Sequence, residues 1–205
     1  MSSSLEPLLE DLRAKQSAKR RAAAKKLRRL AHAEAGPHLL AALKAEVSDP
    51  RTWETQYQMV MALGECGYAE SSPFIEELSL RQFEATMIYV AIGDVLVRLS
   101  SGSKITTIIS LIDQARHRML IDGALRAMAM LRLVPTEAEI LRVTAYAATL
   151  PGNDGNRFWI IAACPGWPAK ATEQFLTDCA EADRPDFQEA LLLAKSGKYK
   201  TWRPL

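Results

Sequence analysis

Two stretches decide the fold: residues 27–40, LRRLAHAEAGPHLL, and residues 63–76, LGECGYAESSPFIE. Their prolines, Pro37 and Pro73, lie 36 residues apart, and so do their leading leucines. In each stretch the end of an apolar helix is followed by a short turn, and proline stands in the first turn of the next helix. Proline is well placed there because a first-turn N–H has no partner within the helix. The two stretches therefore predict a repeated pair of helices.

The same spacing continues along the chain. Leu96 follows Leu63 by 33 residues, and Met130 follows Leu96 by 34. A period of this length corresponds to one helical hairpin, which cannot bury its apolar face until neighbouring hairpins stack on it. Helical periodicity dominates throughout, and no run alternates apolar and polar residues as a strand does. We therefore expect an all-α fold, a right-handed α-α superhelix (α-solenoid) of about five stacked antiparallel hairpins.

The periodicity places a short opening helix, five helical pairs and a closing helix. Their expected ranges are 5–14, 17–33, 37–47, 52–66, 72–80, 83–99, 103–115, 118–133, 136–150, 156–164, 169–182 and 186–196. Residues 151–156, PGNDGN, interrupt this pattern with turn formers. They form either an ordinary loop or a hinge. Because only about 50 residues follow them, we expect residues 1–205 to be a single domain.

Composition excludes several classes of protein. A chain of 205 residues suits one domain or a short repeat array. Its 48% of apolar and 24% of charged residues are ordinary for a globular protein and exclude global disorder. No window reaches the roughly 18 apolar residues of a membrane span, and the N-terminus lacks the pattern of a secretory signal. Cys66, Cys164 and Cys179 form no CxxC pair. We expect a cytoplasmic, reduced protein without a membrane partner.

Motifs for metal, nucleotide or nucleophile chemistry are missing from the sequence. His32, His38 and His117 belong to no zinc-binding pattern. The sequence has neither a phosphate-binding glycine loop nor a G-x-S-x-G elbow. We therefore expect no metal site, no cofactor, no catalytic residue and no enzymatic activity.

Residues 111–125, LIDQARHRMLIDGAL, resemble the signature of HEAT repeats. That signature has an aspartate in the turn between repeats, an arginine about five residues later and then a helix with small residues. Residues 61–67, MALGECG, are similar to the matching end of a first helix. The resemblance covers roughly residues 17–182 and implies the α-solenoid fold rather than an activity. The second repeat departs from the signature, since Asp49 is present but Glu54 stands where arginine would follow.

Charge is distributed unevenly. Residues 12–33 hold nine basic side chains and no acidic one, so in a chain of net charge +2 the remainder carries −7. On a helix most of these side chains lie outside the apolar stripe, where they form a basic patch. Arg20 falls inside the stripe, so we expect it either to reach water along its aliphatic stem or to pair with an acid. The basic patch consists of Lys15, Lys19, Arg21, Lys25, Lys26, Arg28 and Arg29.

In HEAT-repeat proteins the second helix of each pair lines the concave face. By this resemblance, the face that binds a partner would contain His38, Lys44, Glu76, Glu77, Arg81, Asp113 and Arg142. A mixture of signs suits a protein ligand better than a polyanion. The leading hypothesis is thus a non-enzymatic protein-binding module, which could be an adaptor, an assembly factor or an inhibitor of the immunity-protein type.

Two alternatives remain open. The basic helix at residues 13–29 could bind nucleic acid, and the basic and aromatic residues 195–203 could stack on bases or simply fold back onto the last helix. The least favoured alternative is a HEAT-like DNA-alkylation-repair glycosylase. Resemblance to that group would imply a catalytic aspartate near arginine and aromatic side chains, but no local motif assigns this role to Asp94 or Asp122. We expect Asp94 to pair with a neighbouring helix end or with Arg98.

Overall fold

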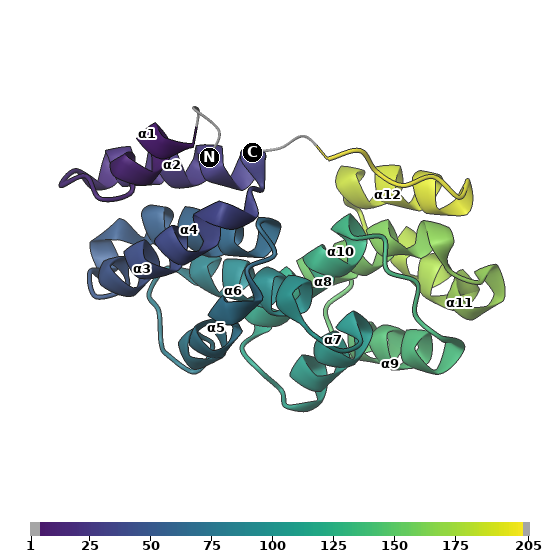
Figure 1. Cartoon of the computed structure of the whole chain (residues 1–205). Coiled ribbons are helices and arrows are strands. Elements are labelled where there is room, and N and C mark those ends of the chain that lie inside the picture. Colours follow the sequence, from purple (N-terminus) through teal and green to yellow (C-terminus); the bar gives the residue numbers. More distant parts are fainter. Residues whose placement is uncertain (1–4, 203–205) are drawn as a thin grey trace. The chain divides into compact units, whose positions relative to one another are not determined.

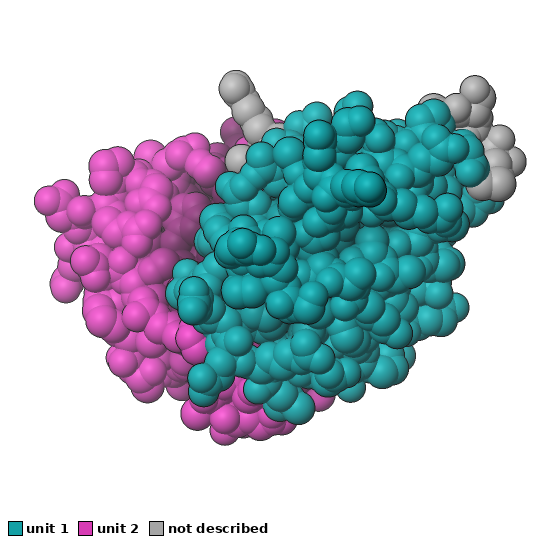
Figure 2. Space-filling view, turned by 90° about the vertical axis from the view of Figure 1, so that its left-hand side faces the viewer, with its two compact units in different colours: residues 1–101 teal, residues 102–205 magenta. Residues whose placement is uncertain are grey.

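The computed structural model describes residues 5–202, which hold twelve α-helices and no strand (Figure 1). The expected all-α class is therefore confirmed. The chain forms two compact units, residues 1–101 (unit 1) and residues 102–205 (unit 2), which Figure 2 distinguishes by colour. Within the described range, no helix is both long enough and apolar enough to cross a bilayer.

Unit 1 contains two rows of helices. In one row α2, α4 and α6 pack side by side. The other three helices lie on this row: α1 contacts α2, α3 contacts α4, and α5 contacts α6. The helices are α1 (Glu6–Asp11), α2 (Ser17–Leu30), α3 (Gly36–Glu46), α4 (Trp53–Glu65), α5 (Ser72–Leu78) and α6 (Thr86–Leu99).

The two repeated stretches explain the plan of unit 1. Leu27 in α2 and Leu63 in α4 are completely buried, at matching places in successive helices of the row. Pro37 and Pro73 each occupy the first turn of the following helix, as expected. Because α4 has a neighbour on either side, it buries more of its circumference than α2 does, including the polar side chain of Gln56.

Unit 2 repeats this arrangement. Here α8, α10 and α12 form one row, while α9 contacts both α7 and α11 in the other. The helices are α7 (Lys104–Asp113), α8 (Arg118–Met130), α9 (Glu137–Ala148), α10 (Gly155–Ala163), α11 (Ala169–Ala180) and α12 (Pro185–Lys195). The turn formers at 151–154 lie between α9 and α10, inside this unit, where Asp154 caps α10 by accepting a 2.8 Å hydrogen bond from the Asn156 amide.

The C-terminal segment folds back onto unit 2. The ring of Trp202 lies 5.2 Å from that of Trp159 on α10, and Lys200 pairs with Glu189 on α12 at 2.5 Å. This confirms one of the two alternatives for residues 195–203, as far as Trp202. Arg203, which belonged to the same basic and aromatic cluster, lies outside the described residues.

Candidate functional site

The buried face of α2 is fixed by one ion pair. Arg20 donates from Nε to Oε2 of Glu46 at 2.5 Å and from Nη2 to Oε1 at 2.8 Å. Its Nη1 also donates to the carbonyl oxygens of Ala14 and Lys15, both at 2.8 Å. The pairing with an acid that we expected of Arg20 is confirmed. This side chain holds α2 against α3 and fixes the loop that precedes α2.

One edge of α2 uses its cations within unit 1. Arg21 forms an ion pair with Glu54 at the start of α4. Arg28 donates to Oε1 of Gln58 at 3.5 Å, and its guanidinium lies 6.0 Å from the centre of the Tyr57 ring. These two members of the predicted basic patch therefore contribute to the contact between α2 and α4.

The opposite side of α2 is different. At 100° per residue, its four other cations share one arc of the helix: Lys25 and Arg29 lie across from the buried stripe of Ala23, Ala24 and Leu27, and Lys19 and Lys26 lie on the flank beside Ala23. Within residues 5–202 none of the four forms an ion pair, and all but the half-buried Lys25 are exposed. Lys15, in the loop before α2, is also exposed and unpaired within that range. We call Lys19, Lys25, Lys26 and Arg29 the cationic face.

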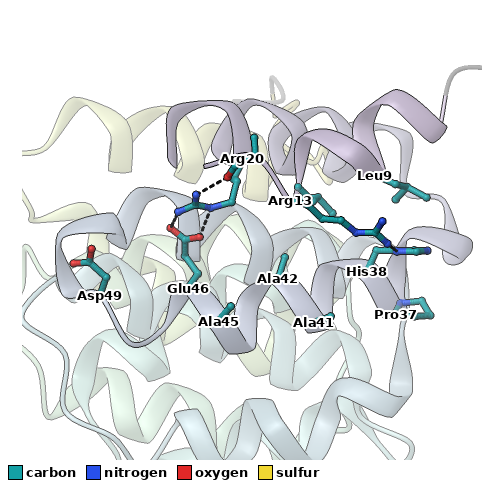
Figure 3. Close-up of a pocket in the computed structure, with 12 residues that line it drawn as sticks. Leu9, Arg13, Arg20, Pro37, His38, Ala41, Ala42, Ala45, Glu46 and Asp49 are labelled. Carbon is teal, nitrogen blue, oxygen red and sulfur yellow. Dashed lines mark hydrogen bonds and ion pairs between the residues drawn. The ribbon is translucent and has the colours of Figure 1, made fainter. Parts of the chain in front are cut away.

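A half-open groove lies beside this helix, between α1 with its following loop and α3 (Figure 3). Its volume is about 560 Å³. Three small side chains of α3, Ala41, Ala42 and Ala45, leave the space, and Leu9 of α1 and Leu12, directly after this helix, line it from the other side. Its other lining residues are Arg13, Ala14, Arg20, Pro37, His38, Glu46 and Asp49.

The groove has a charged group at each end. At one end Arg13 points toward His38, and its Nη2 donates to Nδ1 of the imidazole at 3.3 Å (Figure 3). Toward the other end lie the Arg20–Glu46 pair and Asp49. Asp49 accepts two hydrogen bonds from the Arg51 side chain, and this contact lowers the pKa of the Asp49 carboxyl. Both acids are thus already paired, whereas in the described part of the chain Arg13 has no acid as a partner.

The predicted concave-face residues are distributed over both units. Two ion pairs form among them: Glu77 with Arg81 at 2.5 Å in unit 1, and Asp113 with Arg142 in unit 2. Lys44 lies 5.4 Å from the centre of the Phe74 ring, and Glu76 is exposed. Of this set only His38 lines the groove. That the set forms one binding face stays a prediction.

The second acid that we considered, Asp122, lies in a polar network in unit 2. Its Oδ1 accepts a 3.3 Å hydrogen bond from Nε1 of Trp159. Burial raises the pKa of the Asp122 carboxyl above its usual value. The hydrogen bond from Trp159 lowers this pKa in part, and the nearby negative charge of Asp154 raises it further. Asp154 in turn pairs with Arg118. The structure therefore brings Asp122 into hydrogen-bond contact with Trp159, and it pairs the nearby Arg118 with Asp154.

Asp94 is completely buried, and the pairing that we expected is confirmed. It accepts a 2.5 Å hydrogen bond from Nε of Arg98, which also donates to Glu65 at 3.1 Å.

The thiols of Cys66, Cys164 and Cys179 are also buried. Burial raises the pKa of Cys66 and that of Cys179 to about 11, and it also raises that of Cys164. Few thiolates therefore form at neutral pH, where the thiolate would be the nucleophile.

Replacing Asp122 with asparagine is expected to flatten the dependence of stability on pH. Between the ordinary pKa of 3.8 and the raised value, the folded chain keeps a proton that the unfolded chain has lost, so the free energy of unfolding falls as pH rises through this interval. Asparagine keeps an acceptor for Trp159 without this titration. Urea unfolding from acid to neutral pH measures the slope, and the exposed Asp183→Asn is the matched control. An unchanged slope in Asp122→Asn would contradict the assignment.

Residues 5–202 contain no group of three His, Cys, Asp or Glu side chains that could hold a metal ion. Comparisons with protein-family models, with curated proteins and with solved structures find no match to this chain. The function must therefore be inferred from the two features of unit 1, the cationic face and the groove.

Proposed function

We propose that this protein is a non-enzymatic protein-binding module that docks the acidic surface of a partner onto the cationic face of α2. The observation that carries the proposal is the uneven pairing of charge along this helix. Arg20 and Arg21 are neutralised by Glu46 and Glu54, whereas no acid pairs with Lys19, Lys26 or Arg29 in the described part of the chain. Such a module would serve as an adaptor, an assembly factor or an inhibitor.

Electrostatics favours a partner at this face. Like charges on neighbouring helical turns repel one another, so α2 depends on packing through its buried stripe. The positive charges gathered on the cationic face, in a chain of net charge +2, produce a local electrostatic potential that steers a negatively charged surface into contact. Binding an acidic surface would relieve the repulsion and add ion pairs that unit 1 itself does not supply.

A protein partner suits the rest of unit 1 better than nucleic acid does. Glu76 and Glu77 on α5 are exposed acids on the same unit. A polyanion would favour one sign throughout, whereas a protein surface can match both. As part of this proposal, the helical hairpins stack as an α-solenoid of the HEAT type, in which α5 is a second helix and presents Glu76 and Glu77.

Reversing three charges of the cationic face should weaken partner binding at least tenfold, which is about 1.4 kcal/mol or more. We would compare Lys19→Glu/Lys26→Glu/Arg29→Glu with a matched triple variant, Lys170→Glu/Lys195→Glu/Lys198→Glu. Both triples change the same net charge at exposed positions. Quantitative affinity capture from the native host should retain a protein on the wild type and on the matched variant and lose it on the α2 variant. Equal loss on both triples would mean that only net charge matters.

Fluorescence anisotropy tests the nucleic-acid alternative, with labelled duplex and single-stranded DNA titrated at low and physiological salt. A phosphate-binding helix would show affinity that falls steeply with salt, because counterions are released on binding. We expect no such binding at physiological salt. Tight, salt-dependent binding that the α2 triple variant abolishes would replace the protein-binding proposal with the nucleic-acid one.

A further inference from the structure

We infer that the groove between α1 and α3 is a second binding site, which receives a glutamate or aspartate side chain from an acidic peptide segment of the partner, with Arg13 as the residue that binds the carboxylate. This inference rests on the proposed function and adds a site distinct from the cationic face. The groove size is suitable, since about 560 Å³ lies within the range of ligand pockets, about 300–1,000 Å³.

The hydrogen bonds at the groove single out Arg13. A guanidinium has five N–H donors. Arg20 uses its nitrogens on Glu46 and on the carbonyl oxygens of Ala14 and Lys15. Within residues 5–202 the Arg13 side chain forms one hydrogen bond, to a ring nitrogen of His38, and no acid neutralises it. Its planar fork is therefore available for a carboxylate, which it can bind through two parallel hydrogen bonds.

The loop that carries Arg13 is held in place before any ligand binds. Leu12, directly before it, is buried, and the carbonyl oxygens of Ala14 and Lys15, directly after it, accept hydrogen bonds from Arg20. The backbone on both sides of Arg13 is thus anchored to α2 and, through Glu46, to α3. A fixed backbone lowers the entropy that is lost on binding.

The lining of the groove indicates a peptide rather than a free small anion. Beyond Arg13 and His38, the groove continues along α3 over Ala41, Ala42 and Ala45, while Leu9 lies at the end that holds Arg13 and His38 (Figure 3). This apolar stretch can cover the aliphatic part of a glutamate and a neighbouring apolar side chain. At its far end Arg20 is already paired with Glu46 and Arg51 with Asp49, so the described residues there offer no unpaired cation to a second carboxylate. The groove thus suits one carboxylate at one end, followed by apolar groups.

The test is a nuclear magnetic resonance titration of the full chain labelled with 15N. The probes are acetyl-Ala-Leu-Glu-Leu-Ala-amide, the same peptide with glutamine in place of glutamate, and glutarate. We expect the glutamate peptide to shift the amide signals of Ala41, Ala42 and Ala45 at millimolar concentration and to bind about tenfold more tightly than the glutamine peptide. Arg13→Gln should abolish this difference, and Arg13→Lys should retain part of it because lysine keeps the charge but not the fork.

Three results would overturn the inference: no shift along α3 up to about 10 mM peptide, equal affinity for the two peptides, or an unchanged difference in Arg13→Gln. Glutarate binding as tightly as the peptide would overturn the peptide assignment in favour of a small dicarboxylate. Arg13 is exposed, so its variants should keep the thermal unfolding temperature of the wild type. These peptides do not require the cationic face, so their failure would leave the charge-reversal test of the proposed function unaffected.

Discussion

Replacing Arg20 with methionine should destabilise the protein by about 3 kcal/mol or more, because it leaves a buried carboxylate without its cation. Only 3% of the Glu46 side chain is exposed, and its remaining partner would be the hydroxyl of Ser17 at 3.2 Å. The substitution also removes the donor to the carbonyl oxygens of Ala14 and Lys15. Urea unfolding monitored by circular dichroism gives the change in the free energy of unfolding.

A double-mutant cycle separates the buried charge from the lost packing. Replacing both partners, Arg20→Met with Glu46→Leu, removes the uncompensated charge, so the double variant should be more stable than Arg20→Met alone. The matched control is Arg51→Met, which breaks an ion pair in the same unit whose arginine side chain is 87% exposed. Exposed pairs contribute about 1 kcal/mol at most. Equal losses in Arg20→Met and Arg51→Met would contradict the buried role of the first pair.

A methyl group at Gly36 should destabilise unit 1 by about 2 kcal/mol, within the usual range for overpacking. Gly36 begins α3, and a Cβ atom added there would overlap Cγ and Cδ2 of Tyr68 and come within 2.7 Å of its Cβ. Rotating the tyrosine ring cannot move the Tyr68 Cβ, so the backbone must shift. The better helix propensity of alanine offsets only about 1 kcal/mol of this cost.

Gly102→Ala is the matched control for Gly36→Ala. An added Cβ at Gly102 would meet no atom within 4 Å, and this residue has no positive φ. Alanine should be neutral or slightly stabilising there, because it restricts the unfolded chain. Thermal and urea unfolding of the two variants would test the close approach of α3 to Tyr68, and equal stability would exclude it.

Much of the secondary structure could be predicted because its signals are local. Helical periodicity located all twelve helices of residues 5–202, with ends that differ by a few residues, and proline marked the starts of α3 and α5. Arg20 stood out because it interrupts an apolar stripe. Its partner could not be chosen from the sequence: Glu46 lies 26 residues away, and only the rotation of α3 about its own axis brings this acid, rather than Glu54, to Arg20.

The groove could not be predicted, because it results from side chains that are small. In sequence, Ala41, Ala42 and Ala45 are ordinary helix formers, and only the placement of α1 beside α3 makes a groove of the space above them. The contact between Arg13 and His38 likewise joins a loop to a helix across 25 residues. For the same reason the sequence placed Asp122 and Trp159 on helices without bringing them together, since 37 residues separate them.

Because the cysteines are buried, the rate at which they react with a thiol reagent measures the transient opening of each unit. Cys66 belongs to unit 1, and Cys164 and Cys179 belong to unit 2. A thiol reagent can reach these sulfur atoms only while the surrounding helices are transiently separated, so the rate of modification measures how often that separation occurs. Mass spectrometry of the modified peptides distinguishes the three positions without any engineered label. The native chain thus carries a separate kinetic probe for each half of its sequence.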